Sequence, residues 1–191
     1  NKPAPPVIPL LERSMTMDGR DDEWFDISPL APPGVSRPLT DRPPPQLRLG
    51  ANDAYLYLFL KAVDHAVVYR DRMDLSVTRN DHLRLVLVDA DGVLKPYIIA
   101  TREPGNVVAH VVSVTGRSLR REPEIAGIWV DTVEGYNIEL RILRQLFRNQ
   151  VGIDVVDVDN PQTRETASTA GGGLASAAEV PAIRLPSPRL D

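Results

Sequence analysis

Four oxygen-bearing side chains near residue 155 have the types and spacing for cation binding. They are Asp154, Asp157, Asp159 and Asn160. A hard cation such as Ca²⁺ takes about six to eight oxygen ligands. Side chains alternate along a strand, so these four converge only if a strand ends by Asp157. Asp157, Asp159 and Asn160 are therefore predicted calcium ligands. The alternative is that they cap a turn by bonding to their own backbone.

Aromatic side chains are the second set that could make a site, because a tryptophan or tyrosine ring can stack on a ligand. The chain has two tryptophans, Trp24 and Trp129. Trp24 lies beside a polar turn, and we predict that it closes one end of the fold. Trp129 alternates with Ile128 and Val130, which leaves its direction open between core and solvent. The predicted ligand-binding residues are Trp129, Tyr136, Asn137, Tyr97 and Arg102.

Catalytic signatures are absent from the sequence. It contains no G-x-S-x-G, H-E-x-x-H or P-loop motif and no cysteine. His65, His82 and His110 are too dispersed to predict a zinc site. The acidic pair Asp21-Asp22 belongs to a predicted turn, whereas a glycosidase needs two carboxylates across a cleft. We therefore predict that this region is not an enzyme.

Composition narrows the partners further. The 191 residues carry a net charge of −4, which makes a nucleic-acid partner an unfavourable hypothesis. No run of about 18 apolar residues is present to cross a membrane. The chain begins with Asn1, and its last residues combine Ser187 and Pro188 in the order typical of a helix start. We interpret it as a fragment of a larger protein, cut where a helix is about to begin.

Strand patterns dominate the middle of the chain. Residues 82–88 place Leu83, Leu85 and Leu87 on one face, and His82, Arg84 and valines on the other. Glu139 falls mid-strand, where burial would require a partner such as an arginine. The strands are predicted at 46–50, 55–63, 82–88, 97–101, 107–114, 125–131, 135–142, 151–158 and 180–185. Short strands separated by Gly, Pro and Asp predict an all-β fold. We expect an antiparallel β-sandwich with jelly-roll or immunoglobulin-like layering and one or two short helical turns, one of them within 143–149.

Four regions follow from these patterns. Residues 1–14 form a proline-rich lead, and residues 15–160 form the ligand-binding sandwich. Residues 161–180 are rich in Gly, Ala, Ser and Thr, which is the composition of a flexible loop. Residues 181–191 are expected to hold a returning strand and the start of the truncated helix.

Five segments resemble, in the same order, the sequence blocks of family-9 carbohydrate-binding modules and their DOMON-like relatives. They are Met17–Trp24, Leu47–Tyr57, Asn80–Asp89, Gly135–Ile142 and Gly152–Asn160. The resemblance implies the same sandwich, a glycan ligand and calcium as the one cofactor to consider. Sugar-binding members usually carry an aromatic residue after the fifth block, whereas residues 161–178 contain none.

Similar domains also form the extracytoplasmic sensor regions of bacterial histidine kinases. The Pro186-Ser187-Pro188 segment resembles such kinases, especially those of the proteobacterial dedicated sortase systems. We therefore expect a periplasmic sensing domain that binds a glycan or envelope component. It would be tethered to the inner membrane through segments outside this chain and dimeric in the full-length protein. The alternatives are a carbohydrate-binding module of a secreted glycan-active enzyme, and a protein-interaction module using the proline-rich residues 29–45.

Overall fold

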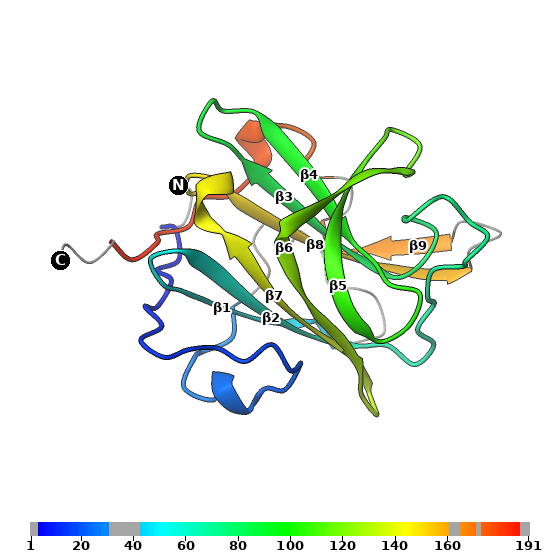
Figure 1. The fold of residues 1–191 in the computed structure, drawn as a ribbon, viewed down its shortest axis with the longest axis horizontal. Helices are drawn as coiled ribbons and strands as arrows, with labels where there is room; N and C mark the ends of the chain where they lie inside the picture. The colour runs from blue at the N-terminus through cyan, green and yellow to red at the C-terminus, as the bar shows by residue number, and fades with distance from the viewer. Residues whose placement is uncertain (1–3, 31–42, 161–164, 171–172, 188–191) are drawn as a thin grey trace.

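Nine strands account for most of the regular structure in the computed structural model (Figure 1), which describes residues 4–30, 43–160, 165–170 and 173–187. The strands are β1 (Gln46–Ala51), β2 (Tyr55–Val63), β3 (His82–Val88), β4 (Leu94–Ile99), β5 (Gly105–Val112), β6 (Ser118–Asp131), β7 (Gly135–Leu143), β8 (Val151–Asn160) and β9 (Glu165–Ser168). Three single 3₁₀ turns accompany them, one more than the sequence predicts: η1 (Asp22–Trp24), η2 (Arg144–Leu146) and η3 (Ala177–Glu179). Among the described residues, no helix is long and apolar enough to cross a membrane.

The strands form one antiparallel sheet that curls over itself, in the order β1-β2-β7-β6-β5-β4-β3-β8-β9. The fold-over runs through β5 and β6. Their pairing passes from Val108 opposite Ala126 to Ala109 opposite Glu122, so three residues of β6 are skipped and the strand bends. One layer holds β1, β2, β7 and the end of β6, and the other holds β3, β4, β8 and β9 (Figure 1). The predicted all-β antiparallel sandwich is confirmed.

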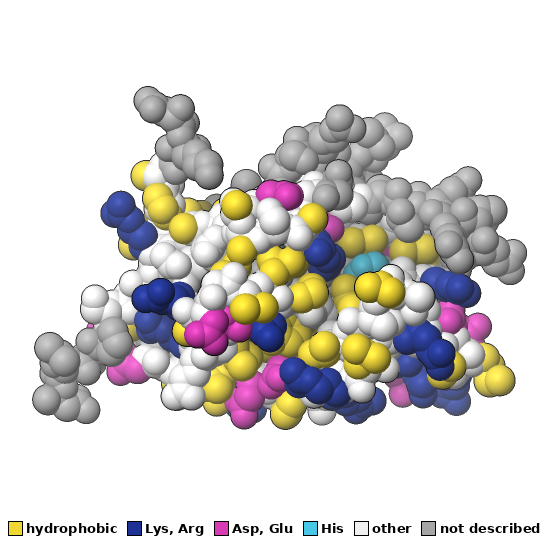
Figure 2. Space-filling model, turned by 90° about the horizontal axis from the view of Figure 1, so that it is seen from above, with side chains coloured by type: hydrophobic (Ala, Val, Ile, Leu, Met, Phe, Trp, Pro, Cys, Tyr) yellow, Lys and Arg dark blue, Asp and Glu magenta, His cyan; other side chains and the backbone are white. Residues whose placement is uncertain are grey.

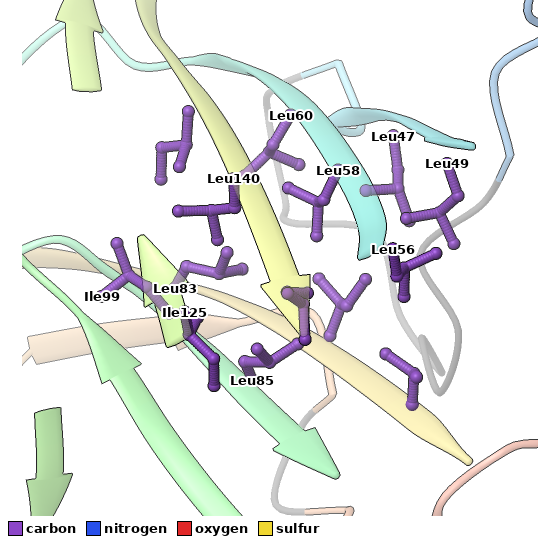
Figure 3. Packing of buried hydrophobic residues seen from close by; sticks show 14 of the residues in the cluster. Leu47, Leu49, Leu56, Leu58, Leu60, Leu83, Leu85, Ile99, Ile125 and Leu140 are labelled. Carbon is purple, nitrogen blue, oxygen red and sulfur yellow. The ribbon is translucent and has the colours of Figure 1, made fainter. Parts of the chain in front are cut away.

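Leucines at every second position build the core between the layers (Figure 3). Leu56, Leu58 and Leu60 point inward from β2, and the leucines of β3 face them from the other layer. Each fully buried leucine stabilises the fold by about 1.5–3 kcal/mol. The period-two pattern is therefore sufficient to fix which face of each strand is inside.

The outer face of the first layer is covered by the N-terminal segment. Tyr57 and Phe59 of β2 point away from the core and pack against Trp24, Leu11 and Ile27. Trp24 is completely buried, which confirms its predicted structural role. The proline-rich lead, as far as residues 4–14 show, is thus part of the folded domain.

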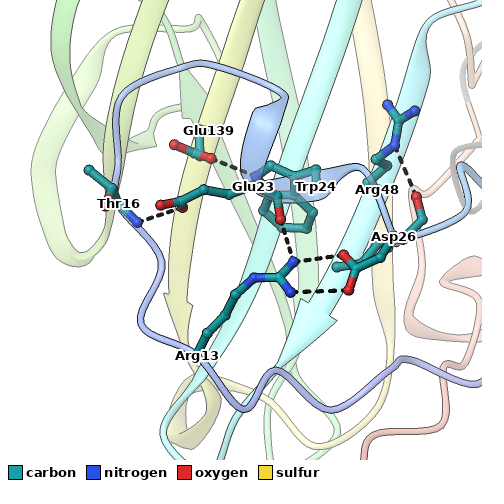
Figure 4. Close-up of polar contacts among 8 residues, drawn as sticks. Arg13, Thr16, Glu23, Trp24, Asp26, Arg48 and Glu139 are labelled. Atoms are coloured by element: carbon teal, nitrogen blue, oxygen red, sulfur yellow. Dashed lines mark hydrogen bonds and ion pairs between the residues drawn. The ribbon is translucent and has the colours of Figure 1, made fainter.

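Glu139 of β7 fastens this segment to the sheet (Figure 4). Its carboxylate accepts hydrogen bonds from Trp24 Nε1 at 2.6 Å, from the Asp18 amide at 2.9 Å and from the Gly19 amide at 3.2 Å. Glu139 thus has the partners that its burial requires, although they are two backbone amides and an indole rather than an arginine. Burial raises the pKa of Glu139, and the donated hydrogen bonds oppose that rise.

The C-terminal segment covers the outer face of the second layer. Ala170, Leu174 and Val180 pack on Val86 and Val88 of β3. The predicted flexible loop therefore needs correction: part of it is edge strand β9, and another part is packed against the sheet. The physical reason is that a strand with a second apolar face must be covered, even by small residues.

The predicted returning strand at 180–185 is reduced to single bridges. Ala182 pairs with Gln150, and Arg184 pairs with Val7 in parallel. The Ile8 amide donates to the Arg184 carbonyl at 2.8 Å, and the Arg184 amide donates to the Pro6 carbonyl at 2.9 Å. Segments from the two ends of the chain therefore lie side by side (Figure 1). The helix predicted to start near Pro188 lies outside the described residues.

Candidate functional site

A groove of 730 Å³ opens on the outer face of the second layer, above β3, β4 and β5. We call it the β3–β5 groove. Its lining residues are Ser76, Thr78, Arg79, His82, Arg84, Ile98, Val112, Ser113, Val114, Thr115, Gly116 and Val158. Figure 2 views the molecule from above and shows hydrophobic and basic side chains interspersed on that side of the molecule.

Strand register sets the floor of the groove. Arg84 of β3 lies opposite Ile98 of β4, which lies opposite His110 of β5. Ile98 is buried against Val77 and Val112. Because these side chains occupy the face opposite to the leucines, the alternation that builds the core also builds the floor.

Two loops form the walls. The first is the connection between β2 and β3, which contributes Ser76, Thr78 and Arg79. The second is the β5–β6 turn, joined to the first by a hydrogen bond from the Val77 amide to the Gly116 carbonyl at 2.8 Å. Gly116 has a φ of 79°, and a Cβ atom there would lie 2.3 Å from Thr78 Oγ1. Only glycine therefore allows the two walls to approach this closely.

His82 lies at the base of the groove, where burial favours the neutral form of its ring. It is 4% exposed, and burial lowers its pKa. Its Nδ1 lies 2.8 Å from the Asn80 carbonyl oxygen, which can only accept. Nδ1 must therefore carry the proton, and Nε2 is the hydrogen-bond acceptor of the ring.

Two arginines supply the charge of the groove. Arg84 donates to the main-chain carbonyls of Gly173 at 3.4 Å and Leu174 at 3.2 Å. Leu174 holds a φ of 64°, a conformation that side-chain-bearing residues rarely adopt, so the loop is shaped around this contact. Arg79 is half-exposed and lies 3.6 Å from Asp74.

A second pocket, of 710 Å³, has the opposite character. It lies at the end of the first layer, between the Asp18–Asp22 turn and the β6–β7 hairpin. Its lining residues are Asp18, Gly19, Arg20, Asp21, Asp22, Lys61, Val130, Asp131, Thr132, Val133, Glu134 and Asn137. Carboxylates outnumber basic groups here, and we call it the acidic pocket.

The ligand-binding residues predicted from sequence do not come together. Trp129, Tyr136 and Tyr97 are buried in the core, where the rings of Trp129 and Tyr136 stack with centroids 4.4 Å apart. No face of these three rings is open to a sugar, because the inward strand positions belong to the core. Asn137 lines the acidic pocket and donates to the Gly19 carbonyl at 3.0 Å. Arg102 is exposed on the β4–β5 turn and lines neither pocket.

Of the predicted calcium ligands, Asp157 is the one whose side chain the structure describes. Asp157 is buried beside Asp64 and Asp81, with one carboxylate oxygen of each lying within 4.8 Å of the others. We call these three residues the carboxylate cluster. The side chains of Asp159 and Asn160 lie outside what the structure describes. Asp154 faces the other side of β8 and accepts hydrogen bonds from Ser168, Thr169 and Ala170.

Sequence reasoning missed Asp64 and Asp81 because they are 17 residues apart in sequence and meet only in three dimensions. Their sequence signal was their position: one directly follows β2 and the other directly precedes β3. Asp81 accepts from the Val158 amide and from the Val68 amide, both at 2.7 Å. It thereby fixes the loop that forms the first wall of the groove.

The donor set of the carboxylate cluster fits a hard cation, since it offers only oxygens. The other way to relieve the repulsion among the three carboxylates is to protonate one of them. Burial, and then Asp64, raise the pKa of Asp81 to about 8. The proton is therefore retained by the folded chain and released by the unfolded chain across the intervening pH range.

We expect the free energy of unfolding to fall as pH rises from about 4 to about 8, by about 1.4 kcal/mol per unit at the steepest. The sign follows because the folded state binds more protons than the unfolded state in this window. Chemical denaturation in EDTA at several pH values measures it. In Asp81→Asn this contribution to the slope should disappear. An unchanged slope in the variant would contradict the assignment.

Similar proteins were found by comparison of structures and not by comparison of sequences. No protein-family profile matches the sequence, and no curated protein matches it. Among solved structures, a family-9 carbohydrate-binding module from Caldicellulosiruptor kristjanssonii in complex with cellotriose is similar, with a TM-score of 0.63 at 15% identity. The match covers 97% of this chain and 95% of that one. The glucose complex of such a module from the same organism gives 0.59 at 16% identity, with 97% and 96% covered. This chain therefore has the sandwich fold of those modules.

Proposed function

We propose that this β-sandwich is a non-catalytic glycan-binding module and that the β3–β5 groove holds the ligand. The observation that carries the proposal is the full-length likeness to modules solved with cellotriose and glucose. The groove adds chemistry suited to a sugar. Four hydroxyl side chains, a buried histidine and two arginines surround an apolar floor. Polar groups around an apolar surface are the usual composition of a small-molecule site.

Two tyrosine substitutions test which pocket is used. Thr115 is exposed on the second wall, so Thr115→Tyr should fill the β3–β5 groove without disturbing the core. Val133→Tyr, at a fully exposed position of the acidic pocket, is the matched control. In calorimetric titrations with glycans selected on an array, we expect Thr115→Tyr to lose at least about tenfold in affinity and Val133→Tyr to bind like the parent. The reverse result would place the ligand in the acidic pocket.

Calcium remains a proposed ion of the carboxylate cluster. Three carboxylates whose oxygens lie within 4.8 Å of one another provide part of the oxygen set that Ca²⁺ needs. A ligand that binds only the folded state raises the unfolding midpoint. An unfolding midpoint that is the same in Ca²⁺ and in EDTA would contradict calcium binding.

We further propose that the module serves as the extracytoplasmic, periplasmic sensor of a membrane histidine kinase. One observation is compatible with this role, and equally with a module appended to a secreted enzyme: the segments at residues 6–8 and 182–184 pair side by side. A domain inserted between two membrane helices needs neighbouring ends, whereas an appended module does not. The full coding sequence tests the sensor role, because a sensor domain of this kind requires a membrane-spanning apolar segment on each side of it. Ligand binding would act through differential affinity for two signalling states, and dimerisation belongs to the full-length protein.

A further inference from the structure

The two large pockets differ in charge in a way that the whole chain does not predict. Acidic residues outnumber Lys and Arg by 26 to 22, yet none of the described residues that line the β3–β5 groove carries a carboxylate. The acidic pocket holds five carboxylates against two basic groups. The groove is therefore a locally positive site on a negative protein, and a charged ligand would be directed to it.

The positive charge of Arg84 is available to pair with an anionic ligand. Its two hydrogen bonds go to main-chain carbonyls, at 3.2 and 3.4 Å, and neutral carbonyls cannot cancel a full charge. Asp154 is opposite Arg84 in the strand register, but it does not line the groove. One oxygen of Asp154 already accepts three hydrogen bonds from the segment after β8.

The positive charge of Arg79 is also available to an anionic ligand. Its ion pair with Asp74 spans 3.6 Å, which is longer than a hydrogen bond, and half of its side chain is exposed. Exposed ion pairs of this kind contribute little to stability. A ligand anion can therefore take over Arg79 at little cost.

The uncharged residues of the lining also bear on whether the groove suits a neutral or a charged sugar. A neutral sugar face usually stacks on an aromatic ring, and none lines the groove. Its hydroxyls from Ser76, Thr78, Ser113 and Thr115 can instead bond to sugar hydroxyls. Guanidinium groups pair with carboxylates and with phosphate or sulfate in a fork geometry. The recognition energy available here is thus electrostatic rather than based on stacking.

We propose that the β3–β5 groove selects an acidic glycan, whose carboxylate, sulfate or phosphate group pairs with Arg79 and Arg84. The inference rests on the proposed glycan-binding function and specifies its ligand class. The sugar hydroxyls then contact the walls, and Nε2 of His82, whose Nδ1 faces the Asn80 carbonyl, accepts at the base of the groove.

Calorimetric titration of the purified chain with tri-galacturonate, neutral galactotriose and inorganic sulfate tests the proposal. We expect tri-galacturonate to bind at least about tenfold tighter than galactotriose in 50 mM salt. Raising the salt to 300 mM should weaken the binding of tri-galacturonate and of sulfate and leave that of galactotriose unchanged, because screening acts on charges. Arg79→Gln should remove most of the preference and Arg79→Lys only part of it. Arg20→Gln, in the acidic pocket, should leave binding unchanged.

The outcomes separate the two proposals. Equal affinity for the acidic and neutral trisaccharides would overturn the acidic preference and leave glycan binding in place. Sulfate binding that depends on Arg79, with no binding of either sugar, would keep the anion site and overturn glycan binding. No binding of any of the three probes would overturn both. Arg84→Gln serves as a second variant only if its thermal midpoint matches the parent, because Arg84 also holds the covering loop.

Discussion

Replacing Trp129 with alanine is expected to lower the free energy of unfolding by about 3–5 kcal/mol. The ring is completely buried, stacks on Tyr136 and lies 6.4 Å from the ring of Tyr69. Its removal leaves a cavity where the two layers meet. Guanidinium denaturation followed by circular dichroism measures the loss.

Phe25→Ala is the matched control for Trp129→Ala. Phe25 is 82% exposed, and its ring lies against the guanidinium group of Arg13 in a cation–π contact. Its loss should cost no more than about 1 kcal/mol. If Trp129→Ala kept full stability and lost glycan affinity, the ring would be a ligand contact after all, and the groove would be the wrong site.

Replacing Glu139 with alanine should cost at least about 3 kcal/mol, because it leaves the Trp24 indole and two backbone amides without their acceptor. Glu139→Gln preserves the shape and one acceptor oxygen, so a smaller loss of about 1–3 kcal/mol is expected. Since the carboxylate fastens the N-terminal segment to the sheet, protease should also cleave that segment faster in both variants. Denaturation curves and timed proteolysis are the two measurements.

Glu134→Gln controls for the loss of a carboxylate. Glu134 is exposed and lies 3.9 Å from Lys61, a surface pair that contributes about 0–1 kcal/mol. A double-mutant cycle with Trp24→Phe isolates the indole contact, and we expect a coupling of about 1–3 kcal/mol. Additive single and double changes would show that Glu139 acts without Trp24.

The sequence alone was enough to predict the sandwich. Leucine at alternate positions, as in Leu83, Leu85 and Leu87, determines which face of a strand is buried, and a strand with one apolar face needs a second layer. The turns marked by Asp and Gly then separate the strands. Trp24 was also predicted correctly as structural, because a large ring beside a polar turn has few other places to pack.

Pairing partners and sites depended on the tertiary structure. Alternation says that Trp129 shares a face with Ile125, but only the fold-over of β6 shows that this face is inside. Asp64, Asp81 and Asp157 become neighbours because β2, β3 and β8 reach the same end of the sandwich. The groove likewise combines His82 and Arg84 with a distant loop and a hairpin turn. Side-chain period is a local property of the chain, whereas the meeting of strand ends and loops is set by long-range pairing, which local sequence does not encode.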